Sequence, residues 1–375
     1  MMILFLPLGH PWKASGKLDL PYHTLGWPIA YFLGNVNYRI EYIHHIQGGP
    51  HMQDESMTGI EFQKRFGTEE QCKEALAKLR WPNGFVCPNC GHDDGYQLRE
   101  RPLIQCLVCR HQTSVTAGTI FHRTHVPLTC WFWMIYHVAC DKGGASSSRI
   151  ASQLGMWQKT VWHMLQKIRH AMDRRDSGIS LAGLIELDEA VLGPEARRGR
   201  KGKKSEAERK EGKPRGKRLG RKGKDGRKRK TQIEVLVMVE AERFHAGNLV
   251  LKKLEATNYD TIKEVVEQRV DPAQIFKTDM KQSHAVLLGM GHRLFAKKSG
   301  GADSLNHLPI VHKVIGRLKQ FLLSTHHGVS RKYLAGYLQE FVFRFIRRDK
   351  EPAMPLSLLR ACIFTLPMTY AELTT

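Results

Sequence analysis

The chain has 375 residues, of which 42% are hydrophobic, and its formal net charge is +22. This length accommodates two or three domains, and a balance this basic indicates a polyanionic partner, nucleic acid before an anionic membrane. An apolar run of about 18 residues is absent, which excludes a transmembrane helix. The apolar start of the chain lacks the basic region and cleavage site of a secretory signal, so we expect a cytoplasmic protein without membrane association.

Residues 1–56 are rich in proline, glycine, histidine and tyrosine and show no sustained helical or strand period. We leave them as an unplaced N-terminal extension. Two interpretations stay open: translation begins at Met52 or Met57, or the segment is a genuine, poorly ordered arm. From Ile60 onward the apolar spacing predicts one or two short helices.

Residues 57–125 are predicted to hold a zinc ribbon. Two C-x-x-C pairs supply the candidate ligands Cys87, Cys90, Cys106 and Cys109. Their spacing is typical of a four-thiolate zinc site, in which each turn directs two sulfurs at one tetrahedral ion. Four protein ligands leave no open position, so we expect Zn²⁺ to be structural and to stabilise two short strands, Tyr96–Arg99 and Leu103–Gln105. His92 and His111 are the alternative ligands.

Residues 126–178 predict a helix-turn-helix that binds DNA. A serine-capped short helix contains Ala151, whose small side chain permits close helix crossing, and Gly155 supplies the turn before a second helix. That second helix would present its polar residues to DNA as a recognition helix does. The candidates are Gln158, Lys159, Trp162, His163 and Lys167. The alternative is a plain helical hairpin.

Residues 179–350 alternate between strand and helix patterns. Strands are predicted at 183–188, 233–239, 248–254, 275–278 and 293–297, and helices at 259–270, 283–288 and from Pro309 onward. This order matches a ribonuclease-H-like α/β core, a mixed sheet flanked by helices. A basic, glycine-rich insert at 194–230 cannot bury a core, so we expect a disordered loop that binds phosphates without sequence preference. Residues 351–375 are left as a C-terminal tail.

Asp188 and Asp279 each close an apolar run, and adjacent central strands would bring them together. Carboxylates at strand ends suit Mg²⁺ or Mn²⁺, and two such ions can clamp the oxygens of a phosphoryl transfer. His312 and Lys319 share one face of the last helix with Gly316, a residue tolerated there if a backbone or ligand passes close by. The alternative is two ordinary strand-end aspartates and a surface histidine.

The chain resembles DDE-type insertion-sequence transposases that join a zinc ribbon to a ribonuclease-H-like core, the insertion sequence 1595 group with an ISXO-type transposase domain. The resemblance covers about residues 57–375. It rests on the motifs ELDEAVLG around Asp188 and KTDMKQSH around Asp279, the basic insert, the segment RLKQFLLSTHHG and the closing MTYAEL.

The resemblance implies metal-dependent DNA strand cleavage and strand transfer at the ends of an insertion sequence. Asp188 and Asp279 would bind the catalytic Mg²⁺ or Mn²⁺, and Lys319 would contact DNA phosphate. At the position of the family's third acid this chain has His312, a softer ligand that shifts the preference toward Mn²⁺. The residues before His312 depart from the usual lead-in, which leaves open whether His307 is the third ligand and whether this copy is active.

The partners implied are the terminal inverted repeats of the transposon, the target DNA and further copies of the chain, in the cytoplasm at the nucleoid. Two alternatives stand beside an active transposase. One is an inactive DNA-binding protein derived from a transposase. The other is a structure-selective nuclease on the same fold.

Overall fold

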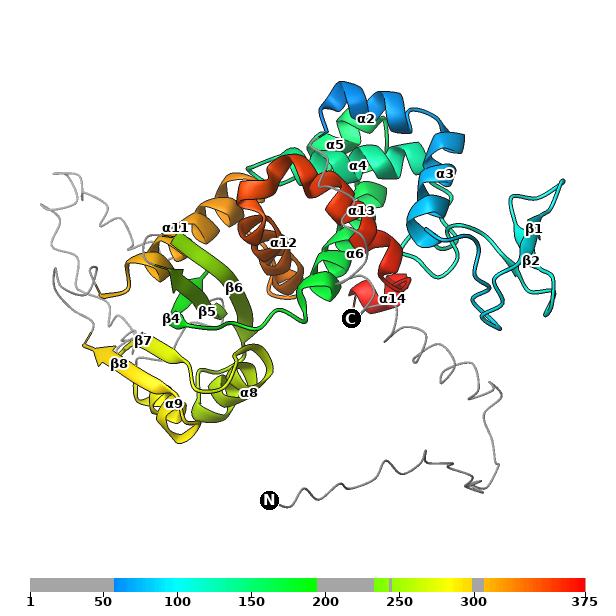
Figure 1. Cartoon of the computed structure of the whole chain (residues 1–375). Coiled ribbons are helices and arrows are strands. Elements are labelled where there is room, and N and C mark those ends of the chain that lie inside the picture. Colours follow the sequence, from blue (N-terminus) through cyan, green and yellow to red (C-terminus); the bar gives the residue numbers. More distant parts are fainter. Residues whose placement is uncertain (1–56, 194–232, 243–244, 299–306, 375) are drawn as a thin grey trace, which may run out of the picture. The chain divides into compact units, whose positions relative to one another are not determined.

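The structure is a computed structural model, and it describes residues 57–193, 233–242, 245–298 and 307–374 (Figure 1). The predicted N-terminal extension and the basic insert lie outside the described residues. Within the described ranges, no helix is both long enough and apolar enough to cross a membrane.

Two capped helices lead into the cysteine-rich region, as the apolar spacing predicts. Helix α2 spans Gly59–Phe66 and helix α3 spans Glu69–Arg80. A threonine precedes each helix, and its side chain and that of a Glu or Gln three residues later satisfy backbone N–H groups reciprocally. Phe62 and Phe66 on α2 are buried, so the amphipathic face of this short helix is fixed by packing.

A three-stranded antiparallel sheet carries the cysteine knuckles. Its strands are β1 (Gly95–Gln97), β2 (Ile104–Cys106) and β3 (Gln112–Thr113), in the order β1-β2-β3. The two strands predicted around Tyr96 and Leu103 are therefore present and paired. Strands this short bury little apolar surface, so the sheet depends on another source of stability.

A helical layer follows the ribbon. It consists of α4 (Leu128–Cys140), α5 (Ser147–Leu154) and α6 (Gln158–Asp176). Gly155 ends α5 in the left-handed conformation, with φ at 63°, and lets the chain turn directly into α6. Ala151 is buried and α5 contacts α6, so the two predicted helices and the turn between them are present; whether they form a DNA-binding helix-turn-helix or a plain helical hairpin stays a prediction.

The end of the chain is a core helix, which corrects the expectation of a C-terminal tail. Helix α13 (Met354–Phe364) packs against α3, α4 and α6, and its Leu358 and Cys362 are fully buried. Apolar residues lie on nearly all sides of α13, so no amphipathic period marks it in the sequence. The short helices η2 (Arg348–Ala353) and α14 (Tyr370–Thr374) flank it.

A five-stranded mixed sheet forms the second core (Figure 1). Its strands are β4 (Leu184–Leu192), β5 (Ile233–Glu242), β6 (His245–Leu254), β7 (Ile275–Asp279) and β8 (Arg293–Lys297). The spatial order is β6-β5-β4-β7-β8, with antiparallel pairs from β6 to β4 and parallel pairs from β4 to β8. This is the ribonuclease-H-like arrangement predicted from the order of elements.

The alternation of side chains along β4 divides its residues between two apolar layers. The helices of the two layers are α11 (Pro309–Ser324) and α12 (Leu334–Ile346) on one face, and α8 (Tyr259–Arg269), η1 (Gln282–Ala285) and α9 (Val286–Gly289) on the other. Ala190 packs with α11, whereas Leu187 packs with α8 and α9. Because successive side chains of a strand point to opposite faces, Asp188 faces α11 and Glu189 faces η1 and α9.

A buried ion pair joins α6 to α12. Arg169 Nε donates to Glu340 Oε2 at 2.8 Å, and Arg344 Nη2 donates to Glu340 Oε1 at 3.0 Å. The Arg169 and Glu340 side chains are 2% and 1% exposed. Burial opposes the charge of Glu340, but the two guanidinium groups outweigh it and lower the pKa of Glu340 to about 2.

Replacing Glu340 with glutamine leaves two buried guanidinium groups without their counter-ion, and we expect the free energy of unfolding to fall by about 3 kcal/mol. Folding lowers the pKa of Glu340 from 4.5, so the carboxylate stabilises the folded chain only while it is ionised. The difference in free energy of unfolding between the wild type and Glu340→Gln should therefore be full above about pH 5 and vanish as the pH falls toward 2. Urea unfolding followed by tryptophan fluorescence at pH 7 and pH 3 measures both effects. Glu74→Gln, in an exposed ion pair with Lys78, should match the wild type; equal stability of wild type and Glu340→Gln at pH 7 would contradict this account.

Candidate active site

The parallel pairing of β4 with β7 places the two predicted aspartates side by side. The register runs from Leu184 opposite Ile275 to Leu187 opposite Thr278, so Asp188 and Asp279 follow at the same level. Asp279 ends β7 as predicted. Asp188 does not end β4, which corrects the sequence interpretation: the strand continues to Leu192 by pairing with β5, a long-range pairing that the local pattern does not reveal.

His312 reaches this edge of the sheet from helix α11. Its Nε2 lies 3.4 Å from Asp188 Oδ2, and its side chain is 34% exposed. Lys319 lies two helical turns further along α11 and is exposed. A Cβ added to Gly316 would meet no heavy atom of the described chain within 4 Å. Among the described residues no backbone passes close to Gly316, so that explanation of the glycine is wrong there; the alternative, a ligand close to this face of α11, stays a prediction.

Glu186 fixes the start of α11 and was missed in the sequence. Its Oε2 accepts hydrogen bonds from the backbone N–H groups of Ile310 at 2.9 Å and Val311 at 2.8 Å. The side chain is buried, and a carboxylate at a helix N-terminus is stabilised by the unpaired N–H groups and the helix dipole. Glu186 on β4 thereby sets the distance between Asp188 and His312.

His307, the alternative third ligand, has a different partner. Its Nε2 lies 3.0 Å from the backbone carbonyl oxygen of Thr278, one residue before Asp279. The structure therefore brings His312 to an aspartate side chain and His307 to the backbone of β7. Which of the two binds metal stays a prediction.

Lys281 lies between the two aspartates and was not among the predicted residues. Its Nζ is 3.4 Å from Asp188 Oδ1 and 3.0 Å from Asp279 Oδ2. Burial disfavours its charge, but the contacts with Glu189 and the aspartates outweigh burial and raise the pKa of Lys281. One cation thus contacts both carboxylates, and a pair of oxygen donors directed at a common cation fits a hard divalent ion such as Mg²⁺ or Mn²⁺.

Two further residues missed by the sequence analysis, Glu189 and His284, complete the buried group. His284 is fully buried, and its Nε2 lies 2.8 Å from Glu189 Oε1. Burial opposes the charge of Glu189, but His284 and Lys281 lower its pKa below the usual value. The sequence did offer one signal: Glu189 follows Asp188 directly, and Lys281 and His284 follow Asp279 within five residues, inside the two motifs that carry the aspartates.

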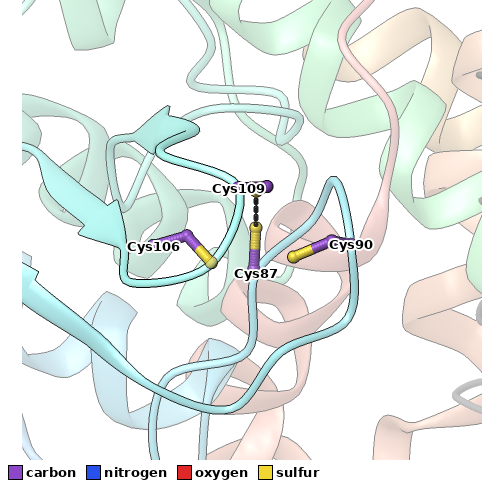
Figure 2. Close-up of side chains that lie close together, drawn as sticks. All are labelled: Cys87, Cys90, Cys106 and Cys109. Carbon is purple, nitrogen blue, oxygen red and sulfur yellow. Dashed lines mark hydrogen bonds between the residues drawn. The ribbon is translucent and has the colours of Figure 1, made fainter.

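The four predicted cysteines form a compact cluster in the ribbon (Figure 2). The sulfur atoms of Cys87, Cys90, Cys106 and Cys109 all lie within 4.8 Å of one another. Zinc–sulfur bonds of about 2.3 Å in a tetrahedron place sulfurs about 3.8 Å apart, so the cluster fits one zinc ion. Cys87 and Cys109 are 3.5 Å apart at sulfur, far beyond a disulfide bond.

The alternative zinc ligands His92 and His111 take part in the knuckles through their backbones. Each backbone carbonyl accepts a hydrogen bond from a ligand cysteine: His92 from Cys87 at 2.8 Å and His111 from Cys106 at 3.0 Å. These bonds close the two turns that aim the sulfurs. The metal-ligating cluster in the described ribbon contains the four cysteines and neither histidine.

The start of α6 is the exposed part of the predicted DNA-binding helix. Gln158 and Lys159 are exposed, as is Trp157, the residue before the helix, at 82%. An indole this exposed is unusual and was not among the candidates.

The other three candidates on α6, Trp162, His163 and Lys167, are half-buried. The His163 ring lies 4.7 Å from that of Tyr370 on α14, and Lys167 Nζ donates to the backbone carbonyl of Ile120 at 3.5 Å. These side chains pack α6 against its own chain. Of the predicted DNA-binding residues, those in the first turn of α6 are therefore the most exposed, and the role of the other three stays a prediction.

Two domain families match the chain. Residues 67–112 match the transposase zinc-ribbon domain, and residues 180–345 match the ISXO2-like transposase domain. Both matched families are transposase domains, and the matches cover the zinc ribbon and the α/β core. The resemblance drawn from the sequence motifs is thereby confirmed, and the matched domain agrees with the ribonuclease-H-like strand order.

Comparison with individual proteins finds low sequence identities. The chain is 28% identical over 131 residues to an uncharacterized protein in transposable element ISH50 of Halobacterium salinarum. That match covers 34% of the chain and 42% of the relative, so it spans less than half of the relative's length. Two solved structures, a pre-cleavage Mos1 transpososome and a Mos1 strand transfer complex, are each 14% identical to this chain, with a TM-score of 0.23. The matches cover 60% and 62% of this chain, respectively, and 76% of the other chain in both cases.

Replacing Cys106 with serine should remove zinc from the chain. The sulfur of Cys106 is buried inside the cluster, and the short strands gain much of their folding free energy from the metal. Zinc per chain, measured by mass spectrometry, should fall from about one to near zero, and amide exchange over residues 95–113 should become fast. Cys130→Ser, outside the cluster, should keep its zinc; full zinc in Cys106→Ser would contradict the assignment.

Proposed function

We propose that this chain is an active DNA transposase that cleaves and rejoins DNA strands at the ends of an insertion sequence. The observation that supports it best is the meeting of Asp188, Asp279 and His312 at one edge of the sheet, in a chain that carries a transposase domain. A net charge of +22 favours a polyanionic substrate.

Asp188 and Asp279 would hold the divalent ion, with His312 as the third ligand. Such an ion, when bound, polarises phosphoryl oxygens and lowers the pKa of bound water. A histidine in place of a carboxylate favours Mn²⁺ over Mg²⁺. Glu186 keeps His312 at its distance from Asp188 through the start of α11.

The DNA backbone would run along the open face of α11. His312, Gly316 and Lys319 lie on one stripe of this helix, since positions three, four and seven residues apart share a face. Lys319 would contact a phosphate near the cleavage point. Gly316, with nothing of the described chain within 4 Å of an added Cβ, leaves room for the sugar–phosphate backbone.

Recognition of the terminal inverted repeats would use the first turn of α6, through Gln158 and Lys159. Their exposure beside Trp157 supports this assignment. Synapsis of two ends and capture of target DNA call for more than one copy of the chain, so the working unit would be a homo-oligomer in the cytoplasm, at the nucleoid.

Incubation of the zinc-loaded chain with a labelled transposon end and Mn²⁺ tests the proposal. We expect strand cleavage at the transposon end, followed by joining of the released 3′-hydroxyl to a target plasmid. Asp188→Asn should lower the cleavage rate by at least about 10²-fold, the scale for losing an electrostatic stabiliser of the transition state. Asp260→Asn, an exposed aspartate at the start of α8, serves as the matched control and should cleave normally.

The outcomes separate the three candidate activities. Binding of the DNA end without cleavage by the wild type would favour an inactive DNA-binding protein. Cleavage without joining would favour a structure-selective nuclease. Cleavage that survives in Asp188→Asn would refute the proposed site.

Lys319→Ala should weaken DNA binding while leaving Mn²⁺ affinity unchanged. Loss of one phosphate contact lowers the slope of log affinity against log salt by about one. Fluorescence anisotropy of a labelled DNA end between low and moderate salt measures the slope. Lys263→Ala, an exposed lysine on α8, is the control and should keep the wild-type slope; an unchanged slope in Lys319→Ala would remove this residue from the DNA path.

A further inference from the structure

Three carboxylates, not two, meet at the Lys281 ammonium. Besides Asp188 and Asp279, Glu189 Oε2 contacts the same Nζ. The Glu189 side chain is 4% exposed, less than Asp279 at 11% or Asp188 at 17%. A carboxylate so deeply buried costs free energy unless it is paired, so its place beside a single cation requires a reason.

His284 directs these oxygens. Its Nε2 lies 2.8 Å from Glu189 Oε1, and its Nδ1 lies 3.1 Å from Asp279 Oδ1. Each carboxylate therefore has one oxygen tied to the imidazole and the other turned toward Lys281 Nζ. The ring is fully buried in the layer beneath the sheet, which holds both carboxylates in a fixed orientation.

His284 lies beside both carboxylates: one ligand atom from each of Glu189, Asp279 and His284 lies within 4.8 Å of the others. Its two nitrogens point to opposite sides of the ring, and each contacts a different carboxylate. A ring nitrogen that bound the ion would give up its contact with one of the two carboxylates, so we assign the imidazole a positioning role. The position that all three carboxylates share is that of the lysine ammonium.

We infer that Glu189 is the third carboxylate of the divalent-metal site, and that the Lys281 ammonium takes the place of the metal when the site is free. The inference rests on the proposed function, because the transposase domain is what implies a divalent ion. It accounts for the histidine at position 312: Glu189 restores the third negative charge that His312 does not supply. In this arrangement His284 is a positioning residue.

Lys281 is suited to leave the site. Its side chain is 43% exposed, whereas the three carboxylates are largely buried. Three negative charges hold a divalent ion more strongly than a monovalent ammonium, so metal loading should expel Lys281 toward solvent. Lysine thus competes with the metal, and removing it should tighten metal binding.

Mn²⁺ titration of the zinc-loaded full-length chain, without DNA, tests the inference by electron paramagnetic resonance of the free ion. Glu189→Gln keeps the size of the side chain and an acceptor for His284, and should weaken Mn²⁺ binding about tenfold or more. Lys281→Met should tighten binding about tenfold. Asp188→Asn should weaken binding, and Glu255→Gln, an exposed glutamate paired with Arg331, should leave it unchanged.

Weaker binding in Glu189→Gln together with tighter binding in Lys281→Met supports the inference. Wild-type affinity in Glu189→Gln, or weaker binding in Lys281→Met, overturns it. If near-ultraviolet circular dichroism shows that Glu189→Gln has lost its fold, Lys281→Met decides alone, since misfolding cannot tighten binding. A wild type that binds no Mn²⁺ contradicts the proposed function as well, whereas binding that Glu189→Gln leaves intact contradicts this inference alone.

Discussion

The parallel pairing of β4 with β7 is the constraint on which the rest of the structure depends. It brings Asp188 and Asp279 to one level of the sheet although they are far apart in the chain. Two carboxylates brought to one partly buried level of a sheet favour a cation between them, because opposite charges attract strongly where little solvent screens them. In the structure this cation is Lys281, whose ammonium contacts both aspartates.

Elements on both faces of the sheet hold this charged cluster in place. Glu186, on the same face of β4 as Asp188, binds the first N–H groups of α11 and so positions His312. On the opposite face His284 orients Asp279 and Glu189. Both layers of helices therefore converge on one strand, and a change at Glu186 or His284 should affect the site without removing a ligand.

Much of this core was predictable because its signals are local. The alternating apolar residues of β5, the helical stripe of α8 and the C-x-x-C spacing each depend on neighbours in sequence, and the structure contains the elements they predict. The aspartates could be paired in advance because the order of elements implied which strands are adjacent. The resemblance that the motifs indicated is confirmed by the matches to two transposase domain families.

The features that the sequence did not predict share one physical cause, long-range packing. Strand β4 extends beyond Asp188 only because β5 pairs with residues 189–192. Helix α13 is apolar on nearly all sides because it lies among α3, α4 and α6, so periodicity gave no sign of it. Lys281, Glu189 and His284 sit in the quoted motifs, but their roles depend on which face of the sheet each side chain occupies.

The central claim is that Asp188 and Asp279 hold one ion at the position of the Lys281 ammonium. Anomalous diffraction from Mn²⁺-soaked crystals of the full-length chain measures this most directly. The account predicts a manganese peak within coordination distance of both aspartates, about 2.2 Å, with Lys281 turned toward solvent. A peak that avoids either aspartate, or Lys281 still in contact with both while manganese is bound elsewhere, would contradict it.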